Sequence, residues 1–365
     1  MNMDFDFQCP TKIYFRNEGV SQIGSIIADD YHFKKVYLIY GGSSLKKYGT
    51  YDKITDSLKK SGIVFEECSG IESNPDIDAI RRMVDDVKRF QPDLILACGG
   101  GSVIDSAKSV AHGYYYDGDP LDFNRHLVKP LHALPIATIL TLVASGSEMS
   151  DSCVVSDRKH HFKSGFNAIT NYPLFSLLDP SLTLSVPAFQ LGCGFADMFC
   201  HSFERYFSPS SSIEPCDGFA LSIMHDIVVT SYAVLRNPDD ISARRAMMIE
   251  GSLAHNGFTN YGKGKMFIVH KAEHVLSGIY PELTHGQGIA LLMAKFLQVN
   301  EERLQNKIME FGRIVFRMNP VSSSDVIDEL EKWICTLPIA HSYSELPFSM
   351  KEEDIHKAEK VLKLK

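Results

Sequence analysis

The stretch Leu94-Ile95-Leu96-Ala97-Cys98-Gly99-Gly100-Gly101-Ser102 decides the fold of this chain. Its first five residues are apolar and predict a short buried strand, which the three glycines end. Apolar residues at helical spacing resume from Ser102 to Ala111. A buried strand that turns directly into a helix is typical of a parallel sheet covered by helices.

The same alternation runs through the first half of the chain and then stops. Strands are predicted at Val36–Tyr40, Leu134–Leu142 and Leu174–Leu178, with helices at Tyr51–Lys60 and Asp76–Phe90. Beyond residue 182 the pattern is helical, at Asp217–Leu235, Ile241–Asn256, Gln287–Val299 and Glu301–Arg317. We therefore predict an α/β domain over residues 1–181, with a Rossmann-like parallel sheet, and an all-α domain over residues 182–365.

The composition excludes several classes of protein. The chain has 365 residues, 44% hydrophobic and 22% charged, which is enough apolar surface to exclude a disordered chain. Its net charge of −8 argues against nucleic acid as a partner, because phosphate binding needs a basic face. The eight cysteines are scattered without a C-x-x-C pair, which argues against a thiolate zinc site and for a reducing compartment.

No targeting or membrane segment is predicted. The N-terminus carries acids and has no cationic region, unlike a signal peptide. The longest apolar stretch, Ala133–Ala144, falls short of the ~20 residues that span a bilayer. We expect a cytoplasmic protein without a membrane partner.

The triple glycine is the first sign of chemistry. Consecutive glycines let backbone N–H groups turn outward, and the helix that begins at Ser102 adds partial positive charge. Gly99, Gly100, Gly101 and Ser102, with Asp105 one turn further, therefore form a candidate pyrophosphate cradle. The pattern is neither G-x-G-x-x-G nor a P-loop, and it also fits a tight strand-to-helix turn without a ligand.

Two further loops follow predicted strands. Tyr40 is followed by Gly41-Gly42-Ser43-Ser44 and then by two lysines. An acid here would bind a ribose 2′-hydroxyl and repel a 2′-phosphate, whereas small donors and cations suit a phosphate. The second loop, Thr141-Leu142-Val143-Ala144-Ser145-Gly146-Ser147-Glu148, is small enough to approach a ring or phosphate. Each loop also fits an ordinary polar turn.

The histidines give a sharper signal. Asp197 and His201 share one helix face at spacing i, i+4, among apolar neighbours, and His270 and His274 repeat that spacing. His285 follows at a glycine turn. A carboxylate buried among apolar residues is costly without a partner or a cation. One aspartate with three histidines would suit zinc or iron, although hydrogen-bonded histidines without a metal remain the alternative.

The chain resembles the iron-containing, or group III, alcohol dehydrogenases, in particular their butanol dehydrogenase and NADPH-dependent aldehyde reductase branch. The resemblance rests on an ordered set of motifs and covers residues 7 to about 318. The motifs are Gly99-Gly100-Gly101-Ser102-x-x-Asp105, Ser145-Gly146-Ser147-Glu148, Leu178-Asp179-Pro180, Asp197-x-x-x-His201, His270-x-x-x-His274 and His285-Gly286.

The resemblance implies a fold and a set of roles. It implies a dehydroquinate synthase-like architecture, an active site in the cleft between two domains, and a homodimer. The family's metal ligands match Asp197, His201, His270 and His285. His274 matches a histidine near the nicotinamide, which we assign to catalysis. The residues that match the cofactor site are Gly41, Gly42, Ser43, Ser44, Gly99, Gly100, Gly101, Ser102, Asp105, Thr141, Leu142, Ser147 and Lys163.

The function implied is hydride transfer between NADP(H) and a small aldehyde or primary alcohol, with one divalent metal, Fe²⁺ or Zn²⁺. NADP(H) is expected to be preferred over NAD(H), because Gly42 stands where NAD-preferring relatives carry an aspartate. A lyase that uses NAD and a metal, as in dehydroquinate synthase, is the alternative on the same scaffold. The ligand segments are flanked by apolar residues such as Phe195 and Phe199, which favours small apolar aldehydes. After Asn319 the likeness weakens.

Overall fold

The computed structural model describes residues 7–208, 214–260 and 267–364 and divides them into two compact units. A sheet unit contains Cys9–Val143 and Ser147–Val186, and a helical unit contains the described residues from Pro187 onward together with residues 144–146 and 7–8. The sequence prediction placed the boundary between residues 181 and 182. Residues 1–6, on which the signal-peptide prediction depends, lie outside the described part.

The sheet unit is built on six parallel strands in the order β1-β8-β5-β4-β2-β3. The strands are β1 (Lys12–Phe15), β2 (Lys35–Tyr40), β3 (Val64–Cys68), β4 (Leu94–Gly99), β5 (Ile136–Leu140) and β8 (Phe175–Leu178). The apolar run Leu94–Cys98 forms β4, which lies between β2 and β5. The predicted α/β class is therefore confirmed.

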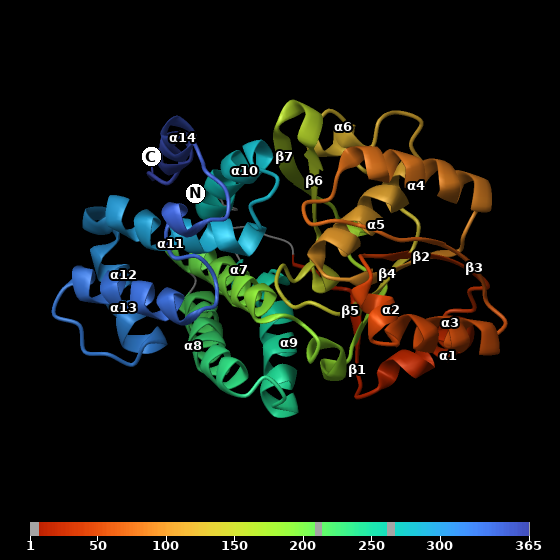
Figure 1. The fold of residues 1–365 in the computed structure, drawn as a ribbon, viewed down its shortest axis with the longest axis horizontal. Helices are drawn as coiled ribbons and strands as arrows, with labels where there is room; N and C mark the ends of the chain where they lie inside the picture. Colours follow the sequence, from red (N-terminus) through yellow and green to blue (C-terminus); the bar gives the residue numbers. More distant parts are fainter. Residues whose placement is uncertain (1–6, 209–213, 261–266, 365) are drawn as a thin grey trace. The chain divides into compact units, whose positions relative to one another are not determined.

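Helices cover both faces of this sheet (Figure 1). Successive side chains of β2 point to opposite faces of the sheet. On one face, Val36 and Leu38 pack with Ile54 and Leu58 of α3 (Thr50–Lys60). Tyr37 points to the opposite face, where its hydroxyl donates to Asp86 on α4 (Ile77–Phe90) at 3.2 Å. Helix α5 (Gly101–Tyr114) packs beside α4.

Smaller elements complete the sheet unit. They are α1 (Ile23–Ser25), α2 (Ser44–Lys47), α6 (Leu121–Asn124) and an antiparallel hairpin of β6 (Ser152–Asp157) and β7 (Phe162–Asn167). The hairpin was not predicted, because its strands carry many polar residues and little apolar alternation.

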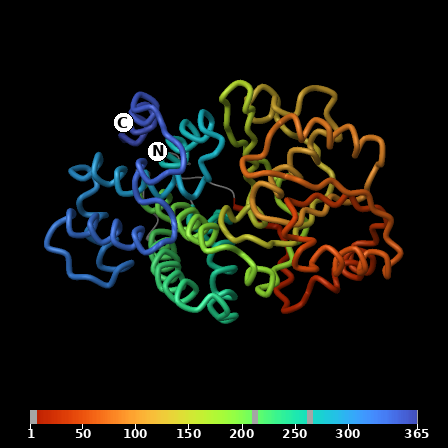
Figure 2. The backbone as a smooth tube through the Cα atoms, viewed as in Figure 1, coloured from red at the N-terminus to blue at the C-terminus, as the bar shows by residue number. Residues whose placement is uncertain are grey.

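Every element of the helical unit from Pro187 onward, within its described residues, is helical. The helices are α7 (Ala188–Phe207), α8 (Glu214–Arg236), α9 (Ile241–His255), α10 (Ile268–Ile279), α11 (His285–Val299), α12 (Glu301–Val315), α13 (Ser323–Thr336) and α14 (Glu352–Val361). Helix α7 packs against α8, α9, α10 and α11, and the tube in Figure 2 follows these helices from green to blue.

The core of this unit includes residues from the tail that matched the family weakly. Trp333 on α13 is buried and packs against Phe199 on α7, with ring centroids 4.4 Å apart. Phe311 on α12 joins the same stack. The tail is thus part of the folded unit.

Helix α8 is long and apolar enough, from Pro215 to Arg236, to cross a membrane. This is weak evidence, because the core helix of a soluble protein passes the same test and α8 packs against α7, α9 and α12.

Candidate functional site

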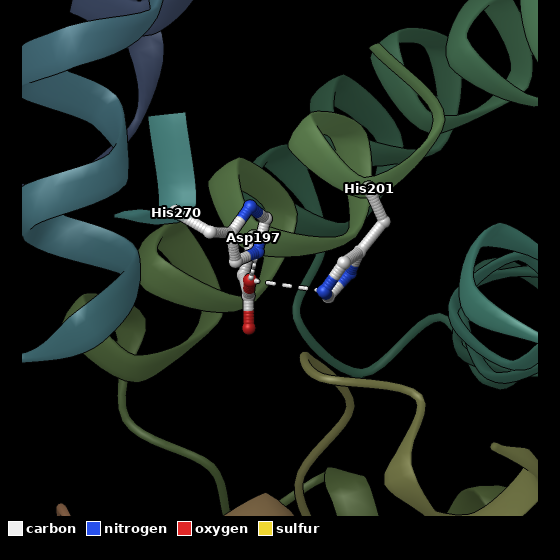
Figure 3. Close-up of side chains that lie close together, drawn as sticks. All are labelled: Asp197, His201 and His270. Atoms are coloured by element: carbon white, nitrogen blue, oxygen red, sulfur yellow. Dashed lines mark ion pairs between the residues drawn. The ribbon is translucent and has the colours of Figure 1, made fainter. Parts of the chain in front are cut away.

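The predicted metal ligands converge in the helical unit. Asp197 and His201 lie one turn apart on α7, and each is only 3% exposed. His270 lies in the first turn of α10, and His285 is the first residue of α11. Figure 3 shows the imidazoles of His201 and His270 turned toward the same oxygen of the Asp197 carboxylate.

Three histidine nitrogens of this cluster converge on one carboxylate oxygen, Asp197 Oδ1, which we call the common point. Asp197 Oδ1 lies 3.7 Å from His201 Nε2, 3.5 Å from His270 Nε2 and 3.7 Å from His285 Nε2. Bonds of about 2.1 Å from a tetrahedral metal would place neighbouring ligand atoms about 3.4 Å apart, close to the observed spacing. Asp197, His201 and His270 offer ligand atoms within 4.8 Å of one another, so these three side chains have the size of a metal site, and His285 adds a nitrogen 3.7 Å from Asp197 Oδ1.

The hydrogen bonds of the cluster test this fit. Among the described residues, the buried Asp197 Oδ1 and His270 Nε2 have no hydrogen-bond partner. Buried polar atoms are rarely left unpaired, and ring nitrogens turned toward a carboxylate without hydrogen bonds call for a cation between them. An aspartate and three histidines form the donor set that zinc and iron accept. The residues present therefore fit a divalent metal.

A glycine explains how α11 brings His285 to the cluster. A Cβ built on Gly286 would lie only 2.1 Å from the carbonyl oxygen of Cys193 on α7. Only glycine allows the first turn of α11 to approach α7 this closely. The His285-Gly286 motif is thus a ligand followed by the residue that permits its position.

Two buried glutamates hold the outer nitrogens of two ligands. Glu204 Oε2 contacts Nδ1 of His270, and Glu273 Oε2 contacts Nδ1 of His285. A histidine that binds metal through Nε2 usually donates its other N–H to a carboxylate, which fixes the tautomer. Neither glutamate is among the site residues predicted from the sequence.

The electrostatics differ between two of the ligands. Burial lowers the pKa of His201 well below its usual value, and His255 and His270 lower it further, so His201 is neutral. Burial alone would also lower the pKa of His270, but the charge of Glu204 and the contact with Asp197 outweigh it and raise the pKa well above its usual value. A metal ion at the common point would displace a proton from His270.

His255 and Phe267 also lie near the cluster, and no role was predicted for them from the sequence. The His255 ring lies 4.1 Å from that of His201, between centroids, and its Nδ1 accepts a hydrogen bond from Arg205 at 3.2 Å. Phe267, just before α10, has its ring centroid 5.3 Å from that of His270. Both residues are far from α7 in sequence, so no local motif reveals them.

The proposed catalytic His274 lies one turn after His270 on α10. Its ring centroid is 5.6 Å from that of His285. The structure thus brings it beside the ligand cluster, although its catalytic role stays a prediction.

In the sheet unit, the triple glycine forms the turn between β4 and α5. A Cβ on Gly99 would lie 2.5 Å from Cγ2 of Val103, and one on Gly100 would lie 3.0 Å from Cβ of Leu142. No described side chain caps α5 at Gly100, and the first N–H groups of a helix have no partner within it. With Gly101 and Ser102 in the first turn, this helix end has the features of a phosphate-binding turn.

Asp105 and Ser147 are placed differently from the glycines. Both are buried, and the Ser147 hydroxyl donates to Asp105 at 2.5 Å. The other Asp105 oxygen accepts the N–H of Val154 at 3.0 Å. These bonds tie α5 to the loop at 147 and to β6, so we assign the two residues a part in supporting the turn.

A buried lysine completes this support. Lys108 on α5 is fully buried, and its ammonium donates to the carbonyls of Ser147, Ser150 and Ser152 and to the Ser147 hydroxyl, at 2.7 to 3.1 Å. Burial lowers its pKa, although Asp105 opposes the shift. No role was predicted for Lys108 from the sequence; a lone lysine in the predicted helix at 102–111 was the available signal.

The remaining predicted cofactor residues, apart from Lys163, follow the carboxyl ends of parallel strands. The N–H of Thr141, after β5, donates to Gly99 at 3.1 Å, which brings Thr141 and Leu142 beside the glycine turn. Gly41, Gly42, Ser43 and Ser44 follow β2, the neighbour of β4. Lys163, on β7, donates to Asn74 at 3.0 Å. Parallel strands present these turns at one edge of the sheet.

The two units thus have the features of a class of protein with a dinucleotide-binding sheet domain and a helical domain whose ligand set fits a divalent metal. Comparisons with known proteins agree. The sequence profile of iron-containing alcohol dehydrogenases matches residues 10–180, and the profile of the family's C-terminal region matches residues 193–363. The second match extends through the tail after Asn319, where the resemblance was expected to weaken.

Individual relatives point the same way. The chain is 38% identical to NADH-dependent butanol dehydrogenase A of Clostridium acetobutylicum over 312 residues, which are 85% of this chain and 79% of that protein. It is 28% identical to the NADPH-dependent aldehyde reductase YqhD of Escherichia coli, over 89% of this chain and 83% of that protein. The crystal structure of NADH-dependent butanol dehydrogenase A from Thermotoga maritima superposes with a TM-score of 0.90 at 28% identity, covering 99% of both chains.

The chain belongs to the iron-containing alcohol dehydrogenase family. It is an oxidoreductase of the alcohol dehydrogenase and aldehyde reductase type, and its family uses NAD(P) and a metal. The lyase alternative is not favoured, since these relatives are dehydrogenases and reductases.

Proposed function

We propose that this protein reduces small aldehydes with NADPH at a divalent metal held by Asp197, His201, His270 and His285. The observation that carries the proposal is the convergence of three Nε2 atoms, at 3.5 to 3.7 Å, on one oxygen of Asp197. In such a site the metal supplies Lewis-acid polarisation of the carbonyl oxygen.

The residues of the chain have separate tasks in this proposal. The four ligands orient the aldehyde by fixing the metal, while the glycine turn at 99–101 binds the dinucleotide through backbone N–H groups. His274, next to His285, delivers the proton that accompanies hydride transfer, since imidazole titrates near neutral pH. Lys163 and Thr141 position the nicotinamide half of the cofactor.

The preference for NADP(H) rests on the turn after β2. The segment Gly41–Gly49 contains no carboxylate, and a Cβ on Gly42 would meet nothing within 4 Å, so space remains for a 2′-phosphate. Lys46 and Lys47 add positive charge nearby, and the Lys46 ammonium lies 4.0 Å from the Glu67 carboxylate, which offsets part of it. The relatives include both NADH-dependent and NADPH-dependent enzymes, so their names do not decide between the cofactors.

An exchange of one residue tests this preference. Wild-type protein should have a higher kcat/KM with NADPH than with NADH, and Gly42→Asp should reverse the order, because the carboxylate repels a 2′-phosphate and accepts a ribose hydroxyl. Steady-state rates with both cofactors measure the effect. A wild-type preference for NADH would contradict the proposal.

Small aldehydes are proposed as substrates because relatives are named for butanol and for aldehyde reduction. Phe199, which the sequence suggested as an apolar neighbour of the substrate, does not support this choice, since its ring packs against Trp333 and Phe311 in the helical core. Phe267, beside His270, is the better candidate for an apolar wall. Rates over a panel of C2–C6 aldehydes test the size range.

Iron or zinc fits the ligand set, and we propose one of these two ions per chain. Elemental analysis of the purified protein distinguishes them. We also propose a cytoplasmic homodimer, following the resemblance to the family. Light scattering with size-exclusion chromatography tests the dimer, and cell fractionation tests the location.

A further inference from the structure

Two buried carboxylates lie behind the proposed metal ligands and connect the helices that carry them. We infer that Glu273 and Glu204 are positioning residues, which tie His285 and His270 into the metal site and set how tightly the site holds its ion. The inference rests on the proposed metal site and adds to it a second layer of residues.

Glu273 is the clearer of the two. Its side chain is fully buried on α10, and its Oε2 contacts Nδ1 of His285 on α11. A Cβ built on Gly288, one turn after His285, would lie 2.8 Å from Cγ of Glu273. The glycine thus leaves the space that the glutamate occupies, as expected for a built contact between α10 and α11.

Glu204 makes the corresponding connection between α7 and α10. Its two oxygens accept the backbone N–H groups of Val269 and His270, so the carboxylate caps the first turn of α10. An anion is favoured at this end of a helix. Oε2 also contacts Nδ1 of His270, so one carboxylate fixes both the start of α10 and the ring that this helix contributes.

The two contacts form a continuous series through the three helices. Glu204 joins α7 to the ligand on α10, and Glu273 joins α10 to the ligand on α11. His201 needs no such tie, because it shares α7 with Asp197, and its Nδ1 has no hydrogen-bond partner among the described residues. A carboxylate thus accompanies each histidine that comes from a different helix from Asp197.

The physical effect follows from the tautomer. When Nδ1–H donates to a carboxylate, Nε2 carries the lone pair and points it at Asp197 Oδ1. The negative charge also makes the ring a better donor to a cation, and loss of such partners typically costs 10- to 100-fold in metal affinity. A glutamate that served only packing would not change the binding of metal.

Glu→Gln substitutions separate these roles, because they keep the size of the side chain and remove its charge. Glu273→Gln and Glu204→Gln are compared with wild-type holoenzyme and with Glu250→Gln. Glu250 is a matched control: it is also buried in the helical unit, and it accepts a hydrogen bond from Thr230 without contacting a ligand.

The measurements are metal retained after dialysis against a chelator series, the visible spectrum of the Co²⁺-substituted protein, and kcat and KM at saturating metal. We expect Glu273→Gln to hold metal about 10- to 100-fold more weakly, to shift the Co²⁺ bands, and to lower kcat with little change in KM for NADPH. Glu250→Gln should match wild type in all three. Glu204→Gln should also unfold at a lower temperature, because Glu204 caps α10.

Two outcomes would overturn the inference, and they differ in what else they affect. If wild type binds metal and Glu273→Gln binds it as tightly with an unchanged Co²⁺ spectrum, the positioning role fails and the proposed site stands. If wild type binds no metal at all, the proposed site fails and the inference fails with it. Glu273→Gln keeps the test decisive even where Glu204→Gln does not fold.

Discussion

The metal cluster of the helical unit and the glycine turn of the sheet unit are built in opposite ways. The cluster consists of side chains from three helices that meet at Asp197 Oδ1. The turn consists of backbone, and its defining residues, Gly99 and Gly100, lack the side chains that would block the approach of Val103 and Leu142. The first site depends on which groups are present, and the second on which groups are absent.

This difference has an energetic side. The cluster places an unpaired carboxylate oxygen and ring nitrogens in a buried setting, which a cation is needed to stabilise. The turn relies on the partial charge of a helix end, which a phosphate meets through several weak contacts. Substitutions in the cluster should therefore be nearly all-or-none, whereas those in the turn should be graded.

The largest effect is expected for His270→Ala. Removing this ligand should abolish stable metal binding and lower kcat/KM at least about 10³-fold, since Lewis-acid stabilisation is worth several kcal/mol. Metal content and turnover are measured on the same preparation. His160→Ala, at a side chain that is 61% exposed, serves as control and should keep its metal. Full activity of a metal-free His270→Ala protein would show that turnover does not depend on a metal held by the cluster.

The next effect tests the support beneath the turn. Lys108→Met should destabilise the protein by about 3 kcal/mol, because it leaves three carbonyls of the 147–152 segment without their buried donor. It should also raise KM for the dinucleotide. Urea unfolding measures the stability, with exposed Lys59→Met as control. Unchanged stability would show that the turn needs no side-chain support.

The sequence predicted some residues of each site but not all of them. Asp197 and His201 could be paired from helical spacing alone, and the β4–α5 turn from an apolar run ending in glycines. Glu204 and Glu273 could not be assigned, because their partners lie 66 and 12 residues away and depend on how three helices pack. An acid within an apolar helix, between two candidate ligands, was the only local signal for Glu273.

The fold shows the same limit. Strands β2, β4, β5 and β8 were predicted within a few residues, because fully buried parallel strands are continuous apolar runs. The β6–β7 hairpin was not predicted, because strand pairing and the contacts with Lys108 and Asp105 stabilise it, and its sequence has no clear alternation of apolar residues. His255 was given no role, and only the packing of α9 on α7 brings it beside His201.

Glu250 is a buried carboxylate of the helical unit that contacts no proposed metal ligand, so it shows what burial alone does to a carboxyl group. Burial raises the pKa of Glu250 from 4.5 to about 7, against the hydrogen bond from Thr230, and Asp226 adds to the rise. Between these pH values the folded state binds more protons than the unfolded state, so stability falls as pH rises. Glu250→Gln should match wild type near pH 4, below the unfolded pKa, and be more stable by up to about 3 kcal/mol at pH 8. Urea unfolding across this range measures the gap, and a gap that does not grow with pH would contradict the assignment.

The smallest effect is expected in the turn itself. Gly99→Ala adds a methyl group 2.5 Å from Cγ2 of Val103, in the first turn of α5, so the turn must shift by a fraction of an ångström. We expect KM for NADPH to rise about 10- to 100-fold, or 1.4 to 2.8 kcal/mol, with metal content unchanged. Gly218→Ala on α8, where a Cβ meets nothing within 4 Å, is the matched control and should leave both unchanged. Loss of metal in Gly99→Ala would mean that the glycine turn and the metal cluster are coupled. The backbone site and the side-chain site would then not have separate functions.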